Sequence, residues 1–162
     1  RLISVQQAPG MNRQIFFCGM GGFDNHDNLI NNHQGLMTTV NAALGAFYDA
    51  LAARGLLNQV TLFTESEFNR TGNANANVGT DHAWGGHHIV YGGAVNPGTY
   101  GTFPTLQLRG PDDAGDRGYF IPTTSLDQYA ATFGAWFGVP DSDLLQIFPN
   151  LANFTPRRLT FL

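Results

Sequence analysis

The sequence predicts an α/β fold in which a layered, mostly parallel sheet is flanked by helices. The first observation is a strand–helix–strand order near the start of the chain. The second is a group of acidic and histidine residues beside the predicted strands. The third is a globular composition, with 43% apolar residues and 13 phenylalanines among 162 residues,. A βαβ unit joins parallel strands by a right-handed crossover, so a ligand site is expected at the carboxyl edge of the sheet.

The βαβ unit is predicted from three consecutive segments. Residues 13–20 are a short apolar run that ends in glycines, which indicates a buried strand,. Residues 33–54 follow as a helix, which Gly55 ends as a C-terminal cap,. Residues 60–64 form the second strand, parallel to the first,. The helix is predicted from apolar residues that recur at helical spacing: Leu36, Met37, Val40, Ala43, Leu44, Phe47 and Leu51,.

The second half of the chain predicts one more strand and two helices. Residues 69–80 are rich in Asn, Gly and Thr and are expected to be a loop, and residues 88–91 are a third short strand,. A helix is expected to begin after Thr124 or Ser125 and to end near residue 137,. Residues 141–148 are predicted as a short helix,.

Length and charge narrow the classes of protein. A chain of 162 residues fits a single domain or a half-domain,. A net charge of −4, with eight scattered arginines and no lysine, argues against nucleic acid binding,. The single cysteine, Cys18, excludes an internal disulfide and a zinc–thiolate cage,. No apolar stretch reaches the ~20 residues of a membrane span. The low share of charged residues, 12%, hints that a partner covers part of the surface,.

Acidic and imidazole groups gather next to the predicted strands, where the loops of a parallel sheet converge. Carboxylates combined with neutral imidazoles suit a divalent ion such as zinc or manganese without any thiolate. The combination of a βαβ unit with these groups therefore favours a metal site. The candidate ligands are Asp24 with His26, Asp81 with His82, and His87 with His88.

Each of these signals also has a structural interpretation. Asp24 with His26 is compatible with a simple turn, because aspartate readily bonds to nearby backbone. His87 and His88 are adjacent and point to opposite faces of a strand, so at most one of them is expected to be a ligand. Glu67 and Arg70 are compatible with a plain ion pair near the edge of the sheet.

Several motifs in register give the chain a family resemblance. The segments that carry it are residues 21–26, 66–71, 79–82, 90–95, 125–130 and 136–139. Their pattern resembles domain of unknown function 1501, a bacterial family whose members look like Tat-exported proteins related to alkaline phosphatases and sulfatases. The resemblance implies the C-terminal part of an alkaline-phosphatase-like fold and a periplasmic location.

The same resemblance implies a division of labour among the ligands. It implies that Asp24 and His26 bind one metal, that Asp81 and His82 serve a second, and that His87 or His88 completes the first site. The ions implied are zinc, manganese or calcium. The nucleophile and one metal aspartate are expected upstream, in an N-terminal half that this chain lacks, so the chain by itself is expected to be inactive.

The expected function is therefore a metal-dependent hydrolase or transferase acting on phosphate or sulfate esters. Glu67 and Arg70 are expected to contact the substrate or to support the ligands, because the arginine fork suits an anionic oxygen. The expected partners are a small anionic ester and either a second copy of the chain or the N-terminal half. The alternative is a non-catalytic exported binding or scaffold protein that keeps the fold.

Overall fold

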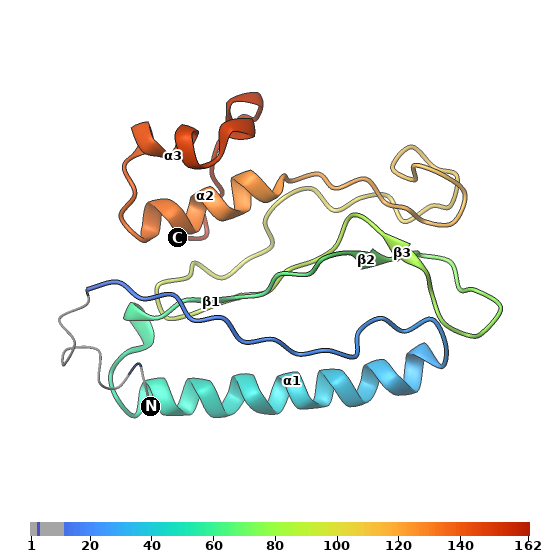
Figure 1. The fold of residues 1–162 in the computed structure, drawn as a ribbon, viewed down its shortest axis with the longest axis horizontal. Coiled ribbons are helices and arrows are strands. Elements are labelled where there is room, and N and C mark those ends of the chain that lie inside the picture. The colour runs from blue at the N-terminus through green and yellow to red at the C-terminus, as the bar shows by residue number, and fades with distance from the viewer. Residues whose placement is uncertain (1–2, 4–11) are drawn as a thin grey trace.

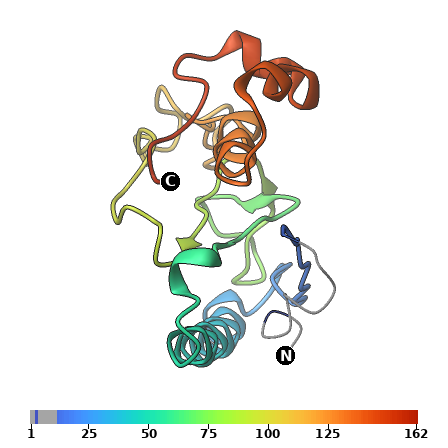
Figure 2. The same cartoon turned by 90° about the vertical axis from the view of Figure 1, so that its left-hand side faces the viewer.

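The computed structural model describes Ile3 and residues 12–162, and it is arranged in three tiers (Figure 1). Helix α1, Leu29–Ala52, forms one side. A middle layer of extended segments separates it from α2, Leu126–Trp136, and α3, Asp141–Ile147. Figure 2 looks along α1 and shows the two helical sides at opposite ends of the molecule. The prediction of mixed helices and strands is confirmed at this level.

Helix α1 confirms the predicted helix, although it begins four residues earlier than expected. It ends at Ala52, two residues before the predicted end, and Gly55 follows with a φ of 65° that other residues rarely adopt,. The amide of Leu56 then donates to the carbonyl of Leu51 and that of Gly55 to the carbonyl of Ala52, both at 3.0 Å,. Leu51 is the one buried residue of the helix. Among the described residues, no helix is long and apolar enough to cross a membrane.

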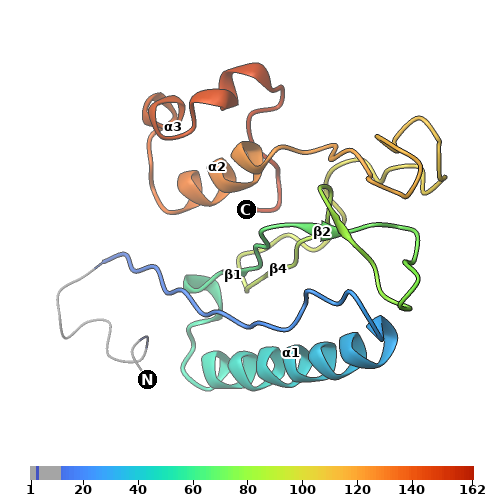
Figure 3. The same cartoon turned by 45° about the vertical axis from the view of Figure 1, so that its right-hand side comes forward.

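The middle layer contains two small antiparallel sheets. Leu62 lies opposite Tyr91 in the first sheet, and Asn69 lies opposite Ala83 in the second. The register shifts by one residue between the two, so they are successive parts of one interrupted hairpin, visible as two extended segments side by side in Figure 3. The strands are β1 (Leu62–Phe63), β2 (Asn69–Arg70), β3 (His82–Ala83) and β4 (Val90–Tyr91), and the 3-10 turn η2 (Leu57–Gln59) precedes them.

Two parts of the predicted sheet are wrong. The strands predicted at 60–64 and 88–91 do pair, but they run antiparallel, because residues 64–89 fold back as a hairpin and contain no crossover helix. Residues 13–20 join no sheet with any described residue. They are extended and largely exposed, with Ile15 79% and Phe17 92% accessible. The described residues therefore do not form a mostly parallel layered sheet.

The buried core lies around α2. Ser125 caps this helix in the predicted way, accepting a hydrogen bond from the amide of Gln128, whose side chain bonds back to the Ser125 amide,. One face of α2 packs Tyr129 and Phe133 against Phe161 near the C-terminus. The opposite face packs against α3 and the 3-10 turn η3, Pro149–Asn153, through three buried residues: Ala131, Leu144 and Leu151. The core therefore holds the β1–β4 part of the hairpin, and the tip of the hairpin lies away from the core.

Candidate metal centre

The hairpin tip lies against the loop that precedes α1. Asp27 forms an isolated antiparallel bridge with Val78, and the amide of Leu29 donates to the carbonyl of Val78 at 3.0 Å. The amide of Thr80 donates to the carbonyl of Asn25 at 3.1 Å. These backbone bonds place residues 24–26 beside residues 80–82, although more than 50 residues separate them in the sequence.

Gly79 is what allows this close approach. A Cβ built at this position would lie 2.1 Å from the carbonyl carbon of His26 and 2.4 Å from the amide nitrogen of Asp27. Both are backbone atoms, so neither can move aside as a flexible side chain would. The two loops therefore meet at this distance only because residue 79 has no side chain.

Three side chains meet in a closed triangle at this junction. Asp24 Oδ1 lies 3.0 Å from His26 Nε2 and 2.9 Å from His82 Nε2, and the two imidazole nitrogens are 3.1 Å apart. Ligands at right angles around a small divalent ion, with bonds of about 2.1 Å, are about 3 Å apart. The three donor atoms are therefore spaced as metal ligands are, and together they form a group that can hold an ion.

The position of the proton on the His26 ring also bears on whether a cation fits in the triangle. His26 Nδ1 lies 3.1 Å from Asp81 Oδ1, and a neutral imidazole that donates there carries only a lone pair on Nε2,. That lone pair then faces the Asp24 carboxylate, with no proton from His26 between them. A cation at this point removes the repulsion, and a carboxylate behind a histidine is the usual support for a metal ligand. The Asp81 carboxylate thus contacts His26 Nδ1, the ring nitrogen that is not a corner of the triangle.

A guanidinium borders the triangle on the Asp24 side. Arg70 Nη1 is 2.5 Å from Asp24 Oδ1, and the Arg70 side chain also donates to the backbone carbonyl and hydroxyl of Thr80. Hydrogen bonds from His82 first, and from Arg70 second, lower the pKa of Asp24 below its ordinary value. Asp24 is therefore held in its anionic, ligand-competent form. The alternative of a plain ion pair between Arg70 and Glu67 is not seen in the structure, where Arg70 contacts Asp24.

An aromatic ring fixes the second histidine. Phe68 stacks on His82 with ring centroids 3.9 Å apart and planes 11° from parallel. Arg70 lies opposite His82 in the β2–β3 pair. Phe68, two residues before Arg70, is on the same face of the strand and therefore lies diagonally across from His82,. Phe68 was not among the predicted site residues, since a single phenylalanine before a loop gives no signal until the strand pairing is known.

A second guanidinium borders Asp81. Arg117 Nη2 lies 2.6 Å from Asp81 Oδ2, and Asn75 Nδ2 donates to Asp81 Oδ1 at 3.2 Å. Hydrogen bonds from Asn75 first, and Arg117 second, lower the pKa of Asp81 to about 2. Arg117 and Asn75 were not among the predicted site residues. Arg117 lies 36 positions from Asp81 in a glycine-rich turn region, and no pattern in the sequence connects the two.

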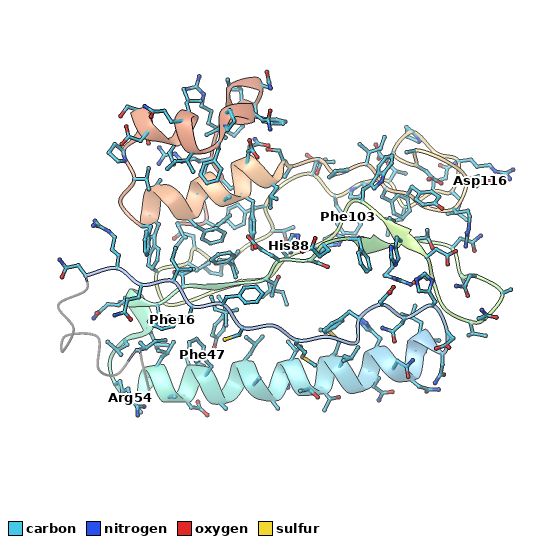
Figure 4. The ribbon with its side chains drawn as sticks, viewed as in Figure 1. Phe16, Phe47, Arg54, His88, Phe103 and Asp116 are labelled. Carbon is cyan, nitrogen blue, oxygen red and sulfur yellow. The ribbon has the colours of Figure 1, made fainter. Side chains whose placement is uncertain are left out.

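The structure does not bring the remaining histidine candidates to the triangle. His87 lies beside Phe103, with ring centroids 5.0 Å apart, and His88 stacks on Tyr129 at 5.4 Å. Figure 4 labels His88 near the middle of the molecule, away from the β2–β3 end shown in Figure 1. Glu67 is exposed. Of the described acidic, histidine and cysteine residues, one group has ligand spacing, and it comprises Asp24, His26 and His82.

Comparison with known proteins places the chain in a family. Residues 6–114 match the family described as "Protein of unknown function (DUF1501)". The chain belongs to this family. The matched region of this DUF1501 protein contains the triangle, Arg70 and Asp81, and it ends shortly before Arg117. No curated protein and no solved structure matches the chain.

Proposed function

We propose that this DUF1501 protein holds a divalent ion on Asp24, His26 and His82 and takes part in the hydrolysis or transfer of phosphate or sulfate esters. The observation that carries the proposal is the triangle of donor atoms with separations of 2.9–3.1 Å. Two imidazole nitrogens and one carboxylate oxygen suit zinc or manganese better than calcium, which prefers oxygen ligands alone.

The residues around the triangle have distinct roles in this proposal. Asp81 orients His26 through its Nδ1, and Phe68 holds the plane of the His82 ring. Arg70 and Arg117 supply two fixed cations beside the triangle, which suit the oxygens of an anionic ester,. A divalent ion bound here would polarise an ester oxygen and stabilise the charge that develops on it.

The exposure of the triangle to solvent lets a substrate approach it. The side chains of Asp24, His26 and His82 are 54%, 48% and 51% exposed. The family resemblance adds three elements to the proposal: an upstream nucleophile with a further aspartate ligand, a second ion served by Asp81, and export to the periplasm. Each of these goes beyond the three-donor group itself.

The test combines metal analysis with an ester screen on the full-length protein. We expect zinc or manganese to bind, and metal-dependent hydrolysis of an aryl phosphate or an aryl sulfate to follow. His82→Ala is expected to abolish both metal binding and hydrolysis, and His87→Ala is the matched control that retains both. A protein that binds no divalent ion would contradict the proposal. Metal binding that depends on His82, with no hydrolysis of either ester, would favour the non-catalytic binding protein.

A further inference from the structure

A cavity of about 700 Å³ lies between α2, α3 and the C-terminal segment 156–162. Helix α3 lies on the side of α2 that faces away from the middle layer (Figure 1), so the cavity belongs to the helical side of the molecule and not to the hairpin tip. All of its lining residues lie between 132 and 162, beyond the region that matches the family. Small-molecule sites usually have volumes of about 300–1,000 Å³, and this cavity is within that range.

The walls of the cavity are largely apolar and are supported by the buried core. Leu144 and Leu151 line it and belong to the buried cluster between α2 and α3. Leu145 packs against the same cluster, and Leu159 packs against the cluster of Tyr129, Phe133 and Phe161. Side chains that are packed against a dense core cannot easily collapse into a neighbouring space. The cavity is therefore formed before any ligand enters it.

Two hydrogen bonds fix the C-terminal segment on α2. Gln128 Nε2 donates to the carbonyl of Pro156 at 2.5 Å, and the amide of Leu159 donates to Thr132 Oγ1 at 2.9 Å. Gln128 and Thr132 are buried, so both bonds are protected from water,. The two bonds lie on either side of residues 157 and 158, which line the cavity. The backbone therefore holds two consecutive arginines at its rim.

These arginines give the cavity a positive charge. Arg158 Nη2 lies 3.2 Å from Asp141 Oδ2, in a pair whose side chains are 42% and 74% exposed. Arg157 is exposed and forms no ion pair or hydrogen bond with any described residue. The three are the charged side chains among those that line the cavity, so one positive charge is left uncompensated. A single carboxylate balances this charge, and its two oxygens match the planar fork of an arginine.

We propose that this cavity binds a medium-chain alkyl carboxylate, with the carboxylate on Arg157 and the chain against the leucines and Trp136. The apolar walls remove the chain from water, and each buried methylene tightens binding by up to about 4-fold. A neutral alkyl molecule would leave the charge of Arg157 without a partner, and a dianion would exceed the single positive charge of the site. The proposal does not depend on the metal centre, which shares no residue with the cavity.

The test measures octanoate binding by calorimetry, in a metal chelator and at constant ionic strength. The chelator keeps the carboxylate from binding an ion on the triangle. We expect hexanoate, which is two methylenes shorter, to bind up to about 15-fold more weakly than octanoate. Arg157→Gln is expected to weaken octanoate binding by about 3- to 5-fold, the upper range for an exposed ion pair, and 1-octanol should bind the wild type more weakly by a similar factor. Arg109→Gln is the matched control, because this exposed arginine does not line the cavity.

Tryptophan emission locates the bound chain. Octanoate is expected to change the emission of the wild-type protein, and this change should vanish in Trp136→Phe and persist in Trp84→Phe, because only Trp136 lines the cavity. Failure of octanoate to bind, or an emission change that persists in Trp136→Phe, would overturn the site. Equal affinities for octanoate and 1-octanol, or equal losses in Arg157→Gln and Arg109→Gln, would overturn the role of the carboxylate and of Arg157. None of these results alters the metal proposal, whose test is zinc or manganese binding.

Discussion

Replacement of Phe68 by leucine tests how the metal centre is held in shape. Leucine keeps an apolar side chain at the position but removes the ring that stacks on His82 at 3.9 Å and 11°. Stacked ring pairs contribute about 0.5–1.5 kcal/mol beyond the burial of their surface. Without the stack, the His82 ring is free to turn and no longer directs its Nε2 at Asp24. Metal binding therefore loses the stacking energy. The dissociation constant for zinc should rise by about 2- to 12-fold, since about 1.4 kcal/mol corresponds to a factor of ten.

The assay is competition with a fluorescent zinc chelator, and two variants control for other causes. Phe103→Leu removes the ring beside His87 and should leave the zinc affinity unchanged, because neither residue reaches the triangle. Arg70 also lies over the Phe68 ring, 5.7 Å from its centroid, so Phe68→Leu has a second effect: it loosens a cation that competes with the metal for Asp24. An Arg70→Gln background removes this second effect. Because the stack on His82 is the expected cause, Phe68→Leu should still lower the zinc affinity in that background. An unchanged dissociation constant in Phe68→Leu, or an equal change in Phe103→Leu, would refute the role of the stack.

Three further substitutions test the fold that positions the site. Gly79→Ala forces a Cβ against the backbone of His26, so we expect zinc affinity to fall more than about 10-fold in the chelator assay, a loss comparable to that of a ligand's supporting residue,. A native pKa of about 2 means that ionised Asp81 stabilises the fold above its ordinary pKa of 3.8 and ceases to do so as the pH falls toward 2,. The urea midpoints of wild type and Asp81→Asn should therefore differ most near about pH 6, and the difference should shrink as the pH falls below 3.8,. Ser125→Ala removes the cap that binds the amide of Gln128 and should lower the free energy of unfolding by about 1 kcal/mol in urea titrations,.

The helices were predictable because their signals are local. The apolar spacing and Gly55 define α1 within a few residues, and Ser125 begins α2 as the capping pattern indicates. The sheet was predicted wrongly because its partners are not local. An apolar run such as residues 13–20 has the composition of a buried strand, yet nothing in that run specifies which segment must pair with it. Residues 69–80 were predicted as a loop, but residues 69–70 form strand β2, and the residues that follow are the turning end of a hairpin.

The candidate ligands were predictable for a different reason. Asp24, His26 and His82 lie in short stretches rich in chemically active groups, and backbone bonds of the loops bring those stretches together. The predicted reason, a shared edge of a parallel sheet, is wrong, since the junction is formed by a hairpin tip and a loop. Phe68 and Arg117 were missed because their roles depend on contacts across the fold. A ring or a guanidinium alone in the sequence does not indicate such contacts.

Anomalous diffraction from crystals grown with zinc tests whether Asp24, His26 and His82 hold the ion. Data collected above and below the zinc absorption edge locate the ion independently of any activity. We expect a peak at the junction of the hairpin tip and the loop before α1, within bonding distance of Asp24 Oδ1, His26 Nε2 and His82 Nε2. A peak held by other residues, such as His87 or His88, or a map with no peak at this triangle, would contradict it.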